Sequence, residues 1–270
     1  DGADPGTTIN SIEFRGVGFA YKDIPVLKNL NMKFEGGKTY ALVGHNGAGK
    51  STIIKLLLRF YDPTEGEILL NGRNIKEYNL QKYRALFATA FQDNRMFSMS
   101  VADNVTLGED IKSEDREQIV TEALKLSGVY DKVMSLPQGI NTTLTREFDD
   151  NGAVLSGGEF QKIVVSRAFA RRCPIKVFDE PSSALDPIAE YQLFDNILKA
   201  CRKNTLLFIS HRLSSVQNAD HVFLLEQGEV REEGTHRELM DRKGLYADMY
   251  QKQAENYLAD KSKQKEGIWA

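Results

Sequence analysis

The stretch that decides the fold is GHNGAGKST, residues 44–52. It satisfies the pattern G-x-x-x-x-G-K-[ST], and the apolar run TYALVG (39–44) precedes it while a helical pattern follows it. In such a loop, glycines let backbone N–H groups curl around phosphate oxygens, and the helix N-terminus adds partial positive charge. The alternative is an ordinary glycine-rich turn. The strand and helix around it favour a phosphate site, in which Lys50 reaches the terminal phosphates and Ser51 coordinates Mg²⁺.

Apolar runs and helical patterns alternate on both sides of this loop, which predicts an α/β domain with a mainly parallel sheet and a hairpin-rich edge. The pattern predicts strands at 11–21, 26–34, 39–44, 66–72, 85–91, 175–180 and 205–210, and a hairpin at 221–234. It predicts helices from Gly49 to a stop at Asp62-Pro63, at 113–128, at 189–201 and after the capping box Thr235–Glu238.

The stretch between about 98 and 166 has few strand signals, and its amphipathic helix at 113–128 carries acidic residues early. We interpret it as an inserted helical subdomain. The expected division is a core at 9–92 and 167–250, a helical subdomain at 93–166 and a C-terminal tail at 251–270. The charged composition from about Asp260 favours disorder.

Composition excludes several classes of protein. The 270 residues carry a net charge of −3 with both signs mixed, and no long basic run indicates nucleic-acid binding. The two cysteines, Cys173 and Cys201, are too few for a disulfide framework and fit a reducing compartment. No apolar stretch approaches the ~20 residues of a membrane span. The start at Asp1, with no signal peptide visible, favours a piece cut from a longer protein over simple processing.

Two acidic residues end the predicted strand IKVFDE (175–180). Beside a phosphate loop, Asp179 can hold Mg²⁺ through water, and Glu180 can orient and deprotonate an attacking water. If the strand continues, alternation places the two side chains on different sides. His211 follows another apolar strand and can hydrogen-bond the γ-phosphate. The alternatives are an acidic turn and a loop histidine without a role.

A second glycine turn, LSGGE (155–159), opens a helical pattern. Ser156 is expected to cap this helix and Glu159 to complete a capping box. The turn has no lysine, so its affinity for anions should be weak, and it could be a helix start alone.

The ordered set of GHNGAGKS, Gln92, LSGGE, VFDEPSSALD and SHR resembles the nucleotide-binding domain of ATP-binding cassette (ABC) transporters. The resemblance covers about Ile9 to Tyr250, and it is nearest to domains fused behind the membrane helices of exporters. It implies a P-loop NTPase core of the RecA type, an antiparallel β subdomain and a helical subdomain. It also implies an ATPase that uses Mg²⁺ and lies on the cytoplasmic face of the cell membrane.

The resemblance assigns site residues by position. Tyr21 matches the aromatic residue that stacks on adenine, although it could also be a core tyrosine. Gln92 matches a glutamine that touches the metal site and couples to the membrane domain. Asp186 matches the aspartate of the D-loop. The phosphate-contacting positions are Gly44, Asn46, Gly47, Gly49, Lys50, Ser51 and Thr52, and the signature positions are Ser156, Gly157 and Gly158.

In this family two such domains meet head to tail, and the phosphate loop of one and the signature of the other enclose the same ATP. The resemblance therefore implies a second nucleotide-binding domain, identical or different, and membrane domains as partners. Two positions depart from the pattern: Glu159 stands where many exporters have glutamine, and Asp149-Asp150 replace a glycine-glutamate pair in 145–154, which puts interdomain coupling there in doubt.

The resulting hypothesis is an ATPase domain that powers export through ATP-driven dimerisation. One alternative is a separate ATPase subunit of an importer. Another is a DNA-repair or chromosome-organising ATPase, although about 100 residues without heptads separate the two glycine turns. A third is a non-enzymatic ATP-binding regulator, against which the intact Glu180 argues.

Overall fold

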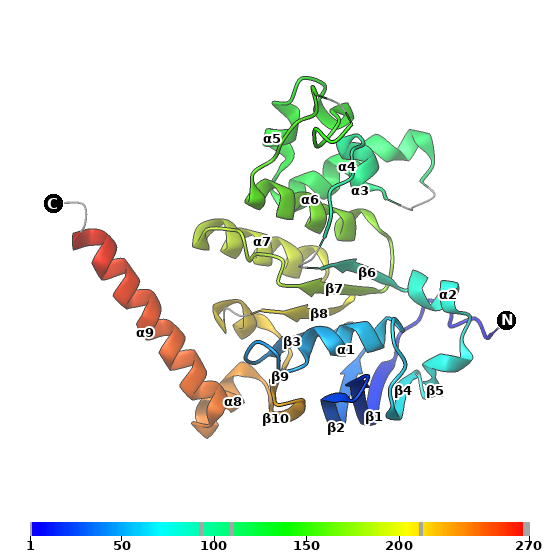
Figure 1. Ribbon diagram of the computed structural model, residues 1–270, viewed down its shortest axis with the longest axis vertical. Helices are drawn as coiled ribbons and strands as arrows, with labels where there is room; N and C mark the ends of the chain where they lie inside the picture. The colour runs from blue at the N-terminus through cyan, green and yellow to red at the C-terminus, as the bar shows by residue number, and fades with distance from the viewer. Residues whose placement is uncertain (1, 92–93, 108–110, 149, 211–212, 267–270) are drawn as a thin grey trace.

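The computed structural model describes residues 2–91, 94–107, 111–148, 150–210 and 213–266. Its central sheet has six strands in the order β10-β9-β3-β8-β7-β6 (Figure 1). Strands β3, β6, β7, β8 and β9 run parallel, and β10 pairs antiparallel with β9. Their bounds are β3 (Thr39–Val43), β6 (Phe87–Ala90), β7 (Ile175–Asp179), β8 (Thr205–Ile209), β9 (His221–Glu226) and β10 (Glu229–Gly234).

The central strands are apolar on both faces because helices or a second sheet cover both. Along β3, Leu42 packs into the core that contains helix α1 (Lys50–Leu57), whereas Ala41 and Val43 pack into the core on the opposite face. This alternation follows from the two-residue period of a strand. The predicted strands and the α/β fold class with a mainly parallel sheet are confirmed.

A smaller antiparallel sheet lies on the α1 side, with the strand order β2-β1-β4-β5. Its strands are β1 (Ser11–Tyr21), β2 (Ile24–Glu35), β4 (Glu65–Leu70) and β5 (Arg73–Asn74), and the short helix α2 (Leu80–Ala85) follows them. Ile53 and Ile54 of α1 are fully buried in a core shared with Phe14 and Phe34 of this sheet. Helix α1, which begins at the phosphate loop, is therefore held between the two sheets (Figure 1).

A group of helices stands beyond the β6 edge of the central sheet (Figure 1): α3 (Val101–Val105), α4 (Ser113–Ser127), α5 (Tyr130–Met134) and α6 (Gly157–Ala170). They share a core of their own, to which Ile163 and Ala170 of α6 belong. Val164, Val165 and Ala168 of the same helix pack against the sheet instead. Helix α6 therefore belongs to both cores and runs through residue 166, where the helical subdomain is expected to end.

The remaining helices cover the face opposite α1. They are α7 (Pro187–Ala200), α8 (His236–Arg242) and α9 (Leu245–Glu266). In the described ranges, no helix combines the length and the apolar character that a membrane crossing needs.

The structure differs from the prediction at the end of helix α1 and in the C-terminal tail. Helix α1 ends at Leu57, before Asp62-Pro63, because Arg59 adopts a left-handed conformation with φ 54° and its guanidinium donates hydrogen bonds to the carbonyl oxygens of Ile75 and Tyr78. The prediction of disorder from about Asp260 is also wrong, since α9 continues to Glu266 and extends away from the sheets (Figure 1). Its Ala, Gln, Glu and Lys residues are good helix formers, which explains the continuation.

Candidate functional site

The predicted site lies where the parallel strands end. The phosphate loop follows β3, Asp179 and Glu180 stand at the end of β7, and Ser210 follows β8. Carboxyl ends of parallel strands share one edge of a sheet, which is where open α/β sheets bind ligands. Gln92 follows β6 and His211 follows β8, and both lie outside the described residues, so their predicted roles stay predictions.

Two glycines of the phosphate loop have a positive φ and leave no room for a Cβ atom. Gly44 has φ 145°, and a Cβ there would lie 2.2 Å from the carbonyl oxygen of Leu225. Gly49 has φ 102°, and a Cβ there would lie 2.6 Å from Cδ2 of Leu27. The glycines therefore permit both the left-handed turns and the close packing of the loop against β9 and β2.

Lys50 lies inside the curve of this loop. Its Nζ atom donates hydrogen bonds to the carbonyl oxygens of Gly44, at 2.8 Å, and His45, at 3.0 Å. Burial lowers the pKa of the Lys50 ammonium group, and the carboxylates of Glu180 and Asp179 oppose that shift. The lysine therefore lies within electrostatic reach of both predicted acidic residues, although they come from a strand two places away in the sheet.

The N-terminus of α1 is available to an anion. Gly49 is its N-cap, and no side chain caps it within the described chain, whereas α6, α7 and α8 are capped by Ser156, Asp186 and Thr235. Uncapped N–H groups of a first turn suit a phosphate. Ser51 is exposed in that turn, and Thr52 is buried beside it. The loop and helix thus fit the phosphates of a nucleotide.

The backbone at Asp179 and Glu180 differs from the expected strand, which would have continued through Glu180. Strand β7 ends at Asp179, and Glu180 turns out of it with φ 52°, so strand alternation does not set the direction of its side chain. The Glu180 N–H donates to the carbonyl oxygen of Ile209 at 3.1 Å. A left-handed glutamate costs of order 1–3 kcal/mol and persists only where its surroundings hold it. Asp179 is buried, and Glu180 is half-buried.

Tyr21 lies at the end of β1 beside α1. Its hydroxyl oxygen is 3.5 Å from Oγ1 of Thr52, and its ring packs edge to face against Phe19 and Tyr61. The ring is partly exposed. The structure therefore joins the residue predicted to stack on adenine to the predicted phosphate loop.

The second glycine turn begins α6 as predicted, with Ser156 and Glu159 forming the capping box. Ser156 and Gly157 are exposed. A Cβ on Gly158 would lie 3.1 Å from Cδ2 of Leu185, so the turn packs against the loop that follows Glu180.

Asp186 caps α7. Its Oδ1 atom accepts hydrogen bonds from the N–H groups of Ala189 and Ile188, both at 3.0 Å. These bonds hold the pKa of the Asp186 carboxyl group below its usual value.

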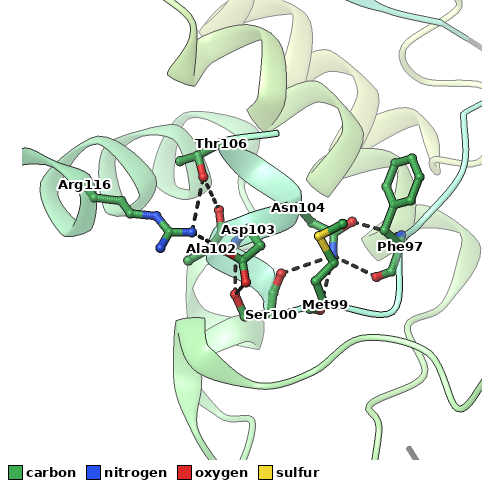
Figure 2. A network of polar contacts seen from close by, with 8 residues as sticks. All are labelled: Phe97, Met99, Ser100, Ala102, Asp103, Asn104, Thr106 and Arg116. Atoms are coloured by element: carbon green, nitrogen blue, oxygen red, sulfur yellow. Dashed lines mark hydrogen bonds and ion pairs between the residues drawn. The ribbon is translucent and has the colours of Figure 1, made fainter. Parts of the chain in front are cut away.

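Asn104, which we did not predict as a functional residue, holds the segment that follows Gln92 (Figure 2). Its side chain is fully buried, accepts from the N–H of Phe97, and donates to the carbonyl oxygens of Phe97, Met99 and Ser100. From α6, Arg167 donates to both the carbonyl and the side-chain oxygen of Asn104. A buried asparagine with so many bonds is not visible in the sequence, where it stands in an ordinary polar position of SMSVADNV.

Gln161 is the second residue that sequence reasoning missed. Its amide contacts Glu180, Ser183 and Ala184, all in the loop between β7 and α7. The sequence does show a glutamine two residues after LSGGE, at the start of a helix with an apolar centre. That pattern alone does not indicate that its side chain contacts the loop after β7.

The phosphate loop, the uncapped helix and the acidic strand end define a P-loop nucleotide-binding domain. The chain belongs to the ABC transporter family, since the family model described as ABC transporter matches residues 27–183, more than half of the chain. The predicted family is thereby confirmed, and the chain is an ABC ATPase domain.

Relatives and solved structures agree with this assignment. The chain is 39% identical over 251 residues to Multidrug resistance protein 4 of Entamoeba histolytica, covering 90% of this chain and 19% of that protein. It is 39% identical over 244 residues to the ATP-dependent lipid A-core flippase of Escherichia coli, covering 90% and 41%. A bacterial Atm1-family ABC exporter with ATP bound superposes with a TM-score of 0.84 and 36% identity, over 92% of this chain and 42% of that one. The chain therefore spans less than half of each of these proteins.

Proposed function

We propose that this chain powers export across a membrane, by binding ATP between two head-to-tail copies of the domain and hydrolysing it there. The observation that carries the proposal is the position of Lys50, whose Nζ donates to the carbonyl oxygens of Gly44 and His45 inside the phosphate loop, at the uncapped N-terminus of α1. The three proteins named above are a multidrug resistance protein, an ATP-dependent flippase and an ABC exporter by name, which favours export over an importer subunit or a DNA-repair ATPase.

In this proposal, the phosphates are bound by the loop N–H groups and Lys50, and Tyr21 stacks on the adenine. The loop contacts come from Gly44, Asn46, Gly47, Gly49, Ser51 and Thr52. Ser51, Asp179 and Gln92 hold Mg²⁺, which supplies charge neutralisation for the phosphate oxygens. The exposed hydroxyl of Ser51 and the buried carboxylate of Asp179 are oxygen ligands of the type that Mg²⁺ prefers.

Hydrolysis is assigned to Glu180, Gln92 and His211. Glu180 orients and deprotonates the attacking water, and His211 hydrogen-bonds the γ-phosphate. Glu180 is only half-buried, so a water can reach it, and Lys50 neutralises negative charge at the phosphates. Positioning and electrostatic stabilisation supply most of the catalysis in such reactions.

The partner is a second nucleotide-binding domain, identical or different. Ser156 and Gly157 are exposed at the start of α6, so they can reach a nucleotide held by another copy. ATP bound between two copies stabilises the dimer by mass action, and hydrolysis removes that stabilisation. Neither nucleic acid nor a further cofactor is required.

The partner membrane domains are expected to contact the segment after Gln92, with the chain on the cytoplasmic face of the cell membrane. Phe97 in that segment is 40% exposed, while Asn104 and Arg167 tie its backbone to α6. Movement of α6 on dimerisation can therefore reach the membrane-facing segment. We assign 93–166 as the helical subdomain, 9–92 and 167–250 as the core and 251–270 as the tail, with α6 and α9 crossing two of these boundaries.

The test is Glu180→Gln in the purified chain. ATP binding should be retained, turnover should be nearly abolished, and ATP should trap a dimer that is measurable by light scattering. Glu114→Gln, an exposed glutamate of α4, is the matched control and should behave as wild type. Undiminished phosphate release by Glu180→Gln would refute the assignment.

A further inference from the structure

The nitrogen and the oxygen of the Gln161 side-chain amide both form hydrogen bonds to the loop between β7 and α7. Its Nε2 donates to the carbonyl oxygen of Glu180 and to Oγ of Ser183, and its Oε1 accepts from the N–H of Ala184, each at 2.9 Å. A backbone N–H can only donate and a backbone carbonyl can only accept. The orientation of the amide is therefore fixed by its partners, and a carboxylate cannot replace it.

Both elements joined by Gln161 are rigidly held. On the helix side, Val164 and Val165 of α6 are buried against the sheet. On the loop side, Oγ of Ser182 donates to Oε1 of Glu190 in α7 at 2.8 Å. Gln161 thus connects two anchored elements, and displacement of one is passed to the other rather than absorbed by a mobile loop.

The two elements serve different ATP molecules in the head-to-tail dimer of the proposed function. Helix α6 begins with Ser156 and Gly157, which face the nucleotide held by the partner. Glu180 acts on the nucleotide held by Lys50 of its own chain. Gln161 lies five positions after Ser156 and contacts Glu180 directly.

We propose that Gln161 is a positioning residue that couples the two ATP sites of the dimer. When the partner's ATP draws in the start of α6, the Gln161 amide holds the Glu180 backbone in its left-handed turn and so sets the direction of its carboxylate. Each site then becomes competent for hydrolysis only when the other is filled. This inference rests on the head-to-tail dimer of the proposed function.

The Glu180 backbone is suited to such control. Its N–H donates to the carbonyl oxygen of Ile209 at 3.1 Å, and its carbonyl oxygen accepts from Gln161 at 2.9 Å and from the N–H of Ser183 at 3.4 Å. Loss of the Gln161 bond leaves that carbonyl oxygen with the longer Ser183 bond, which comes from within the same loop and does not tie the loop to α6. A small misplacement of a catalytic group is enough to cost a large factor in rate.

The test compares Gln161→Glu and Gln161→Ala with wild type in the full chain. Both should lower kcat by about tenfold or more. They should leave the ATP dissociation constant of the monomer unchanged and reduce the Hill coefficient for ATP hydrolysis toward one. Gln118→Glu is the matched control, because Gln118 is an exposed helical amide that donates to the exposed Glu122 of the same helix. It should keep the wild-type rate and cooperativity.

The outcomes separate this inference from the proposed function. If Glu180→Gln traps a dimer while Gln161→Glu keeps the wild-type kcat and Hill coefficient, the coupling role is overturned and the proposed function stands. A non-cooperative wild type, or loss of ATP binding in both Gln161 variants, also overturns it. If Glu180→Gln still turns over, the proposed function fails first. Adding Gln161→Glu to Glu180→Gln should leave ATP-trapped dimerisation intact, which a general folding defect would not.

Discussion

The hydroxyl oxygen of Tyr21 lies 3.5 Å from Oγ1 of Thr52, so the end of β1 touches the first turn of α1. An aromatic ring on the small sheet is thereby fixed beside a loop that belongs to the large one. A nucleotide that stacks on this ring with its base can reach the loop with its phosphates.

Tyr21→Ala should weaken ATP binding about tenfold, because base stacking on an aromatic side chain contributes about 1–3 kcal/mol. Tyr21→Phe should bind nearly as wild type, since it retains the ring. Calorimetric titration with ATP measures both. Equal losses in the two variants would show that the hydroxyl contact with Thr52, rather than the ring, is what matters.

Lys50→Ala should remove most of the affinity for ATP, because the buried ammonium is lost from the centre of the loop. The same titration checks it, with Lys38→Ala as the control, since Lys38 is an exposed lysine paired with Glu35. An unchanged dissociation constant for Lys50→Ala would count against the pocket.

Glu159 gives a prediction on pH. Hydrogen bonding from the N–H of Ser156 lowers the pKa of the Glu159 carboxyl group from 4.5, with help from Lys132. The folded-state pKa lies below the unfolded value, so this stabilisation is present above pH 4.5 and is lost as the pH falls through the folded-state pKa. Wild type should thus exceed Glu159→Gln in unfolding free energy at neutral pH by about 0.5 kcal/mol. The difference should vanish in acid, and urea unfolding across this range measures it.

Asn104→Ala should destabilise the fold by about 3 kcal/mol, because several buried backbone groups lose their partner at once. Asn104→Asp should be no milder, because it keeps the acceptor for the Phe97 N–H and for Arg167 but sets a buried carboxylate oxygen against the carbonyl oxygens of Phe97, Met99 and Ser100. Urea unfolding gives the values. A loss below about 0.5 kcal/mol for the alanine variant would mean that the network is not important for stability.

Much of the fold was predictable because its signals are local. The apolar runs that become β3, β7 and β8 are short and bounded by turns, and the caps Ser156, Asp186 and Thr235 stand immediately before helical patterns. These features depend on neighbouring residues alone, so the sequence contains them in full.

Features that depend on tertiary contacts were not predictable. Helix α1 ends early because Arg59 reaches Ile75 and Tyr78, residues on a later segment. Glu180 leaves the strand because the loop after it is held by a residue on α6. Asn104 and Gln161 look like ordinary polar residues until their partners are known. In the site, sequence reasoning thus identified the groups expected to touch ATP and missed those that hold them in place.

The left-handed backbone at Glu180 has a consequence for anyone who engineers this protein. Glycine adopts that conformation without strain, so Glu180→Gly should raise the melting temperature while removing the carboxylate. With the catalytic role proposed for Glu180, selection for thermal stability alone would therefore yield an inactive chain. Under that proposal, thermal stability and ATP turnover favour different residues at this one position.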